Sequence, residues 1–150
     1  MKLDRYDYAL LELVQKDCQT PLRKLAEAVH LSTASVQRRI HKLRENGYIV
    51  SNVAILDPDK LNQVITILVE VEVNRTHISE LELLKQRFSG PEVQQCYYVT
   101  GAADFVLILV VPNMQRFQEI CDKFFHENDN IKSFRTTVVL ERVKSSLNVL

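Results

Sequence analysis

Residues 20–47, TPLRKLAEAVHLSTASVQRRIHKLRENG, contain two short amphipathic helical patterns joined by a very short turn. In the first pattern, apolar residues recur with the spacing of one buried helical stripe: Leu22, Leu25, Ala26 and Val29. Thr20 is a candidate N-cap for this helix, and Pro21 suits its first position because an N–H there would have no helical partner. Ser32 is a candidate cap for the second helix. The stretch therefore predicts a helix-turn-helix motif over about residues 21–44.

The second helix separates apolar side chains from basic ones. At about 100° per residue, Val36, Ile40 and Leu43 share a narrow arc that must face the core. The other arcs carry side chains suited to nucleic acid, since Arg and Lys reach phosphates or guanine, Gln pairs with adenine, and Ser or Thr serve either contact. We expect these residues to contact DNA: Ser32, Thr33, Ser35, Gln37, Arg38, Arg39, His41 and Lys42. An ordinary helical hairpin with a solvated basic face is the alternative, which the spacing, the caps and an acid-free basic arc disfavour.

Charge is divided unevenly along the chain, although its formal sum over 150 residues is zero. Residues 1–50 hold 9 Lys and Arg against 6 Asp and Glu (+3), and residues 51–150 hold 10 against 13 (−3). A basic N-terminal part beside an acidic C-terminal part suits a DNA-binding module joined to a module with another role. With 46% hydrophobic and 25% charged residues, the composition is that of one ordinary folded domain or two small ones.

A further helical pattern precedes the motif. Asp4 is its candidate N-cap, and Asp7 lies in the first turn, where a carboxylate stabilises the positive helix end. Gly47 follows the last helix at the position where a left-handed residue often ends a helix. Residues 1–47 are therefore expected to form an N-terminal (winged) helix-turn-helix domain. The loosely alternating segment 48–56 predicts a strand, and we expect residues 48–62 to act as a strand hinge or linker.

From residue 63 onward, the pattern changes to strands interspersed with two helices. Strands are predicted at 64–73, 93–100, 105–111 and 134–143, and helices at 77–88 and 114–127. This β-α-β-β-α-β order is typical of a ferredoxin-like domain, which would cover residues 63–150. The predicted fold class is therefore α+β.

The strand at 105–111, FVLILVV, has no polar residue on either face. Strands with this pattern are typically buried on both faces. A ferredoxin-like domain has both helices on one face of its sheet, so the other face requires a cover. The simplest cover is the same face of a second copy, and we therefore expect a homodimer. A dimer would also present two reading helices to two half-sites of DNA.

Other residue patterns give no sign of a cofactor. Cys18, Cys96 and Cys121 are widely spaced, which favours buried reduced thiols over disulfides or a zinc site. Asp122 and His126 are one helical turn apart, but without a third ligand a solvated polar pair is favoured over a metal site. No apolar run reaches the roughly 20 residues of a membrane span, and no signal peptide is evident. We expect a cytoplasmic protein without a membrane partner, cofactor or metal.

Six segments follow one another in a specific order and spacing: residues 3–11 (LDRYDYALL), 25–32 (LAEAVHLS), 36–43 (VQRRIHKL), 47–49 (GYI), 91–93 (PEV) and 101–105 (GAADF). Together they resemble the signatures of the Lrp/AsnC (leucine-responsive regulatory protein and asparagine regulator, or feast/famine) transcription factors. The resemblance covers essentially the whole chain. It implies an N-terminal helix-turn-helix, a strand hinge, and a C-terminal amino-acid-sensing ferredoxin-like domain that forms dimers and then octamers. Thr33 departs from the pattern, because many members carry Pro after the capping Ser.

In the family that the chain resembles, effector amino acids bind between dimers near the loop that is here 100–104. Gly101 permits a positive φ and exposes backbone N–H groups that can hold a carboxylate, and Asp104 can offer a counter-charge to an ammonium group. A plain hairpin turn with a solvated or capping Asp is the alternative interpretation. With the resemblance, we expect an amino-acid site lined by Tyr98, Thr100, Gly101, Ala102, Ala103, Asp104 and Thr136.

Three classes of function are compatible with this sequence. The first is a sequence-specific DNA-binding transcriptional regulator whose assembly or DNA binding responds to an amino acid. The second is a nucleoid-associated protein that wraps DNA without an effector, and the third is an enzyme or its regulatory subunit. We do not expect an enzyme, because no nucleophile with its base, no catalytic carboxylate pair and no phosphate-binding glycine loop is evident. A response to added amino acids separates the first class, which we favour, from the second.

Overall fold

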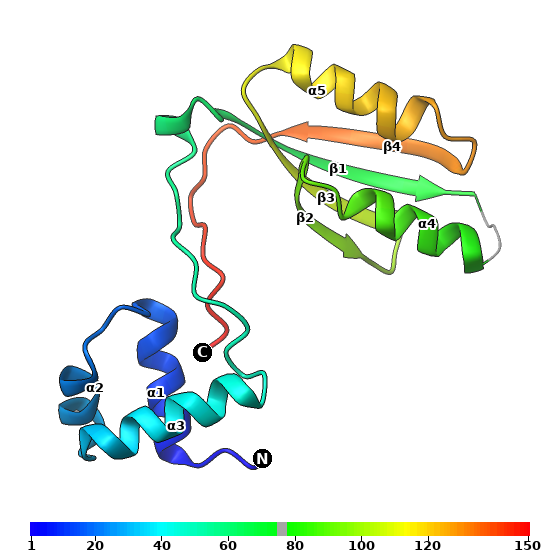
Figure 1. Cartoon of the computed structure of the whole chain (residues 1–150). Coiled ribbons are helices and arrows are strands. Elements are labelled where there is room, and N and C mark those ends of the chain that lie inside the picture. The colour runs from blue at the N-terminus through cyan, green and yellow to red at the C-terminus, as the bar shows by residue number, and fades with distance from the viewer. Residues whose placement is uncertain (75–77) are drawn as a thin grey trace. The chain divides into compact units, whose positions relative to one another are not determined.

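The computed structural model describes residues 1–74 and 78–150, and its contacts divide the chain into two compact units (Figure 1). The first unit comprises Met1–Ile55 together with Lys144–Leu150, and the second comprises Leu56–Val143. The division after residue 55 falls inside the expected linker, 48–62.

The C-terminal segment Lys144–Leu150 groups with the first unit, whereas the sequence pattern extends the second domain to residue 150. The side-chain oxygen of Gln15 accepts hydrogen bonds from the backbone N–H groups of Val149 (3.0 Å) and Leu150 (3.2 Å). The amide nitrogen of Gln15 donates to the carbonyl of Leu150 at 2.6 Å. Periodicity could not predict this grouping, because the contact joins residues far apart in the sequence.

Three helices form the body of the first unit: α1 (Arg5–Lys16), α2 (Leu22–Val29) and α3 (Thr33–Glu45) (Figure 1). Asp4 caps α1 and forms a reciprocal capping box with Asp7. Ser32 caps α3, since its hydroxyl oxygen accepts a hydrogen bond from the backbone N–H of Ser35 at 3.2 Å. Both predicted caps are confirmed.

The start of α2 differs from the prediction. Thr20 is not its cap, because the Thr20 hydroxyl donates to the carbonyl oxygen of Asp17 at 2.9 Å. Pro21 takes the cap position instead, without a side-chain hydrogen bond. After the C-terminal ends of α2 and α3 the backbone is left-handed, at His30 (φ 54°) and at Gly47 (φ 74°) respectively. The predicted role of Gly47 is confirmed.

The core of the first unit lies between the three helices. Its buried side chains are Leu10, Leu25, Ala26, Val29, Val36, Ile40 and Leu43. Each large apolar side chain buried in this way contributes about 1.5–3 kcal/mol. Leu22 is the exception among the predicted stripe residues, because it is exposed at the first position of α2.

The segment after α3 is not a strand. Residues 50–57 have no regular secondary structure, and Val50, Val53 and Ile55 are exposed. A strand requires a neighbouring strand to pair with its backbone groups, and no strand among the described residues of this chain pairs with the segment. The predicted strand at 48–56 is therefore wrong for a single chain.

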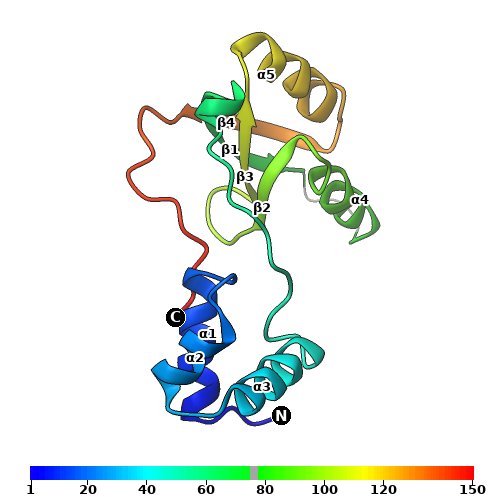
Figure 2. The same ribbon diagram turned by 60° about the vertical axis from the view of Figure 1, so that its left-hand side comes forward.

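The second unit is a four-stranded antiparallel sheet with two helices on one face (Figures 1 and 2). Its main elements are β1 (Ile65–Val73), α4 (Ile78–Phe88), β2 (Val93–Tyr98), β3 (Phe105–Val111), α5 (Met114–Cys121) and β4 (Ile131–Val138). A 3-10 turn, Asp59–Leu61, precedes β1. The strand order β2-β3-β1-β4 and the element order confirm the ferredoxin-like prediction. The first residue of the helix predicted at 77–88 lies outside the described residues.

The core of the second unit lies between the sheet and its two helices. Phe88 of α4 packs edge-on against Phe105 of β3, with ring centroids 5.2 Å apart. Alternate residues of the two central strands are buried beneath the helices: Ile67, Val69, Val71, Phe105, Leu107, Leu109 and Val111. On the opposite face, Val106, Ile108 and Val110 are half-buried, and no helix among the described residues packs over them.

α5 continues into a π-helical turn, Asp122–His126. The sequence pattern predicts a helix over 114–127, but not that its end is π-helical. The N–H of Glu127 donates to the carbonyl of Asp122 at 3.2 Å, an i to i+5 bond. Phe124 and Phe125, both within this turn, are buried.

β4 occupies Ile131–Val138 rather than the predicted 134–143. Its only neighbour in the described sheet is β1, which pairs with it from Val73 opposite Ile131 to Ile67 opposite Val138. Because β1 begins at Ile65, almost no partner remains for residues beyond Val138.

The prediction of buried cysteines is confirmed for Cys121 alone. Cys121 is buried and Cys96 is half-buried, but Cys18 is exposed because it lies in the turn after α1 rather than on a buried stripe. All three are free thiols. Within the described parts of the chain, no helix is long and apolar enough to cross a membrane.

Candidate nucleic-acid interface and effector loop

The outward face of α3 exposes two cations one helical turn apart. Arg38 and Lys42 are exposed, and neither forms an ion pair with an acidic residue in the described parts of the chain. Ser32, Thr33 and Gln37 are also exposed near the N-terminal end of α3, whereas Ser35 is half-buried. This face can donate to phosphates and base edges without first losing a protein partner.

The basic arc contains an acidic residue, so the predicted acid-free arc is wrong. Glu45 lies one turn after His41, and its Oε1 is 3.2 Å from Nε2 of His41. Both side chains are exposed. Glu45 therefore places a negative charge beside His41 on this arc.

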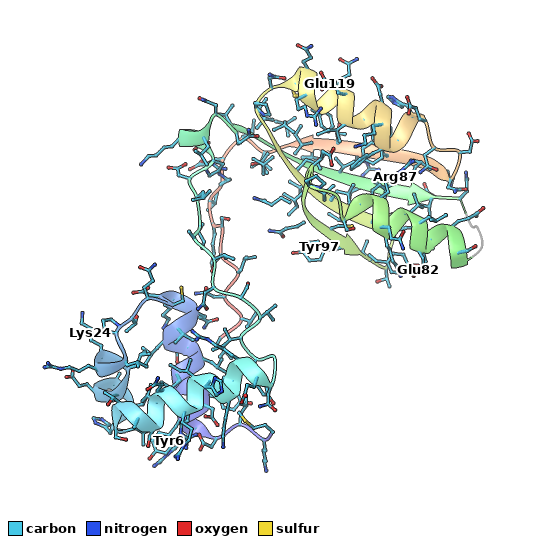
Figure 3. The ribbon with its side chains drawn as sticks, in the orientation of Figure 1. Tyr6, Lys24, Glu82, Arg87, Tyr97 and Glu119 are labelled. Atoms are coloured by element: carbon cyan, nitrogen blue, oxygen red, sulfur yellow. The ribbon has the colours of Figure 1, made fainter. Side chains whose placement is uncertain are left out.

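Arg39 has partners inside the unit, in contrast to its expected place among the DNA contacts. Its guanidinium is 2.7 Å from Oδ1 of Asp7 and 2.9 Å from Oδ2 of Asp4, so it joins α3 to the start of α1. The Asp7 side chain is only 6% exposed, and that of Arg39 is 27% exposed. The guanidinium also lies over the ring of Tyr6, 5.4 Å from its centroid. Tyr6 is labelled in Figure 3.

The charges of this cluster support each other. The pKa of Asp4 is lowered by a hydrogen bond from the backbone N–H of Asp7 and by its bond to Arg39. The pKa of Arg39 is raised, mainly by its hydrogen bond to Asp7. Asp4 and Arg39 are therefore charged near neutral pH, and Arg39 joins α3 to α1 rather than pointing to solvent.

The expected effector loop connects β2 to β3 as a tight hairpin. The N–H of Val99 donates to the carbonyl of Asp104 at 2.8 Å, which closes the loop. Gly101 is exposed with φ 129°, a conformation that side chains rarely adopt, and no atom lies within 4 Å of where its Cβ would be. Thr100 and Ala102 are exposed, and Ala103 is half-buried.

Asp104 ties this loop to the end of β1. Its Oδ2 accepts a hydrogen bond from the N–H of Val73 at 2.8 Å, and its own N–H donates to the carbonyl of Val71 at 2.9 Å. Its other carboxylate oxygen accepts no hydrogen bond from the described residues. Asp104 therefore holds the loop in place and keeps one oxygen for a further donor.

A single chain does not bring together the two outer residues of the expected effector site. Tyr98 ends β2, where its ring packs against Phe105 (5.1 Å between centroids) and lies under the ammonium group of Lys85 (5.2 Å). Thr136 lies on β4, opposite Val69. Because β3 and β1 separate β2 from β4, the two strands are on the order of 14 Å apart. Thr136 does not line the same loop as Tyr98 in one copy.

The possible metal pair is a hydrogen-bonded pair on the surface. Nδ1 of His126 is 2.8 Å from Oδ1 of Asp122, and both side chains are exposed. Across residues 1–74 and 78–150, no group of three His, Cys, Asp or Glu residues could hold a metal ion.

Two family models match this chain. The Lrp/AsnC ligand binding domain matches residues 66–149, and the AsnC-type helix-turn-helix domain matches residues 3–44. The chain belongs to the Lrp/AsnC family. This Lrp/AsnC-family protein is accordingly a transcriptional regulator with a DNA-binding helix-turn-helix and a ligand-binding domain, and its relatives are regulators rather than enzymes.

Relatives match this Lrp/AsnC-family protein over nearly its whole length. An HTH-type transcriptional regulator of Sinorhizobium fredii is 39% identical over 99% of this chain and 89% of its own. The leucine-responsive regulatory protein of Klebsiella pneumoniae is 30% identical over 96% of this chain and 88% of its own.

Solved structures have the same fold. An AsnC family transcriptional regulator from Agrobacterium tumefaciens has a TM-score of 0.92 and 30% identity, covering 99% of this chain and 97% of its own. A Neisseria meningitidis regulator in complex with L-Met has a TM-score of 0.89, covering 97% of this chain and 95% of its own. At 22% identity, the second comparison shows a common fold alone.

Proposed function

We propose that this protein reads double-stranded DNA with the exposed face of α3, and that an amino acid bound at the 100–104 loop changes this binding. The observation that carries the first part is the pair Arg38 and Lys42, which are exposed on one face of α3 and have no acidic partner among the described residues. In a major groove, α3 would present them to phosphates or guanine edges and Gln37 to adenine.

The test measures the affinity of Arg38→Ala and Lys42→Ala for a duplex selected from random sequence by the wild-type protein. A side chain that reads a base is worth about 1–3 kcal/mol, and one that contacts a phosphate lowers the salt slope of binding by about one. Arg116→Ala is a control in the second unit, because Arg116 pairs with Glu119 on α5. If both α3 variants bind like the wild type, the reading face lies elsewhere.

Three observations support an amino-acid effector. The ligand-binding domain model covers residues 66–149, which include the loop. The loop combines a positive φ at exposed Gly101 with a carboxylate oxygen of Asp104 that is open to an ammonium group. A regulator of the same fold has been solved with L-Met. A backbone nest for the carboxylate and a counter-charge for the ammonium would suit any free amino acid, which leaves selectivity to other side chains.

Calorimetry with each standard amino acid tests this part. Asp104→Asn is the informative variant, because the amide oxygen can still accept from Val73 N–H while the negative charge is lost. We expect weaker effector binding with a folded protein. Absence of binding by the wild type to every amino acid would favour the alternative, a nucleoid-associated protein that wraps DNA without an effector.

We also propose that the protein acts as a homodimer that assembles further, up to an octamer. The support is the sheet face with half-buried Val106, Ile108 and Val110, over which no described helix packs. An effector bound between dimers would bind one assembly more tightly than another, and it would change DNA binding by shifting the balance between them. We also propose that the protein is located in the cytoplasm, the compartment that holds the DNA.

A further inference from the structure

An open groove of about 570 Å³ runs along one side of α3 in the first unit. Apolar residues from all three helices line it, among them Val14 of α1, Leu25 of α2 and Ile40 of α3. Arg39 does not line the groove. Its side chain lies on a different side of α3, where it pairs with Asp4 and Asp7. The groove therefore lies next to the outward face of α3.

The polar rim of the groove is positively charged. Arg38, His41 and Arg44 line it, and no Asp or Glu is among its described lining residues. His41 has Glu45 3.2 Å from its Nε2, but the guanidinium groups of Arg38 and Arg44 have no carboxylate partner among the described residues. Two such cations produce a positive potential that attracts an anion. Because Arg38 belongs both to the rim and to the outward face of α3, the groove is continuous with the proposed DNA-reading surface.

Arg44 has a specific setting in this rim. Unlike Arg39 on the same helix, it has no carboxylate partner among the described residues. Its Nη2 is 3.1 Å from the side-chain oxygen of Asn52, in the amide orientation that also lets Asn52 donate to the carbonyl of Ser51. A neutral amide orients the guanidinium but leaves its charge uncompensated, and the remaining donors are available to an anion.

We propose that this groove holds a segment of the DNA backbone, with Arg44 as a phosphate contact and Asn52 as the residue that positions Arg44. Phosphate and sugar account for half to two-thirds of protein–DNA hydrogen bonds. The cationic rim suits the phosphates, and the apolar floor suits the deoxyribose carbons. The proposal rests on DNA reading by α3, and it adds a contact that fixes the register of the protein on the duplex without reading its sequence.

The test compares the affinity of the full-length wild type, Arg44→Ala and Arg44→Lys for two duplexes over a range of salt concentrations. One duplex is selected by the wild type and the other is unrelated. We expect Arg44→Ala to weaken binding to both duplexes by the same factor and to reduce the salt slope by about one. Arg44→Lys should restore most of the slope. Lys16→Ala is the matched control, since Lys16 pairs with Glu12 on α1 and does not line the groove.

Asn52→Ala tests the positioning role. It should lower the affinity while leaving the salt slope unchanged, and its effect should vanish in an Arg44→Ala background, as a double-mutant cycle would measure. An Arg44→Ala protein with wild-type affinity and slope would overturn the proposal even if Arg38→Ala impairs binding. Unchanged DNA binding combined with a lost response to added amino acids would also overturn it, and would identify the groove as a small-molecule site. If Arg38→Ala and Lys42→Ala are without effect, the failure lies in the proposed reading face instead.

Discussion

Asp7 of α1 and Arg39 of α3 form an ion pair of 2.7 Å whose acidic partner is almost fully buried. The contact ties the reading helix to the N-terminal helix, while Asp7 also completes the cap of α1 by accepting from the N–H of Asp4 at 3.1 Å. One carboxylate thus connects the start of α1 with the middle of α3. Its loss should affect stability and the orientation of α3 together.

The first prediction concerns this pair. Asp7→Asn should lower the free energy of unfolding of the first unit by about 1–3 kcal/mol, less than the roughly 3–5 kcal/mol of a fully buried pair because Arg39 is partly exposed. Denaturant titration measures it. Glu12→Gln breaks an exposed ion pair with Lys16 on the same helix and should have little effect. Equal effects of the two variants would contradict a structural role for Asp7.

A second prediction concerns acid stability of the second unit. The pKa of Glu92 is lowered, mainly by a hydrogen bond from Lys123 at 3.0 Å, so the folded state holds its proton less tightly than the unfolded state. The resulting stabilisation is complete above the unfolded value of about 4.3 and disappears as the pH falls through the lower folded value.

Thermal melts of Glu92→Gln and wild type check this expectation. The variant should be less stable at about pH 7, and the difference should shrink below about pH 4. A difference that stays constant with pH would show that the charge of Glu92 has no part in it.

A third prediction compares two neighbouring residues of β3 that face opposite sides of the sheet. Leu107 is completely buried beneath the helices, so Leu107→Asp should unfold the second unit. Ile108 is half-buried on the other face, so Ile108→Asp should leave a folded protein that sediments as a monomer. Circular dichroism and sedimentation velocity separate the two effects. An Ile108→Asp protein that assembles like the wild type would show that this face is not the dimer interface.

The fourth prediction concerns the loop at Gly101. Its φ of 129° is unfavourable for any residue with a Cβ, although the space around it is empty. Gly101→Val should therefore distort the loop, at a cost of ~1 kcal/mol or more, and abolish the effector response. Ala102→Val, at the exposed neighbour, adds similar bulk without a positive φ and serves as the control. Normal effector binding by Gly101→Val would place the site elsewhere.

The fifth prediction orders the three thiols by their rate of alkylation. Cys18 is exposed and should react first, and half-buried Cys96 should follow, since burial raises its pKa. Burial, with a smaller effect from nearby Asp122, raises the pKa of Cys121 to about 11, so its reactive thiolate is scarce at neutral pH. Mass spectrometry of the native protein after brief alkylation measures the order. Fast modification of Cys121 would contradict the buried core position.

The features predicted correctly from the sequence depend on local patterns. The caps Asp4 and Ser32 were recognisable because each bonds to a backbone N–H within three residues. The sheet followed from short apolar or alternating runs and from the order of the elements. The outward face of α3 followed from helical periodicity alone.

The features that the sequence did not reveal depend on distant partners. Arg39 looked like one more cation on α3 because its acidic partner lies 32 residues earlier. Arg44 was not among the predicted DNA contacts, because the groove beside it is formed by three helices and the segment that follows them. The 48–56 segment alternates like a strand, but its conformation depends on whether a partner strand is present.

The π-helical turn at Asp122–His126 has a consequence for insertions and deletions in this region. A π turn contains one residue more than a regular helical turn, so deleting a single residue there would restore ordinary helical hydrogen bonding instead of breaking the helix. The deletion would, however, rotate the side chains on one side of it by about 100° relative to the sheet, and Phe124 and Phe125 are both in the core. In this helix the length of the chain and the filling of the core are therefore coupled.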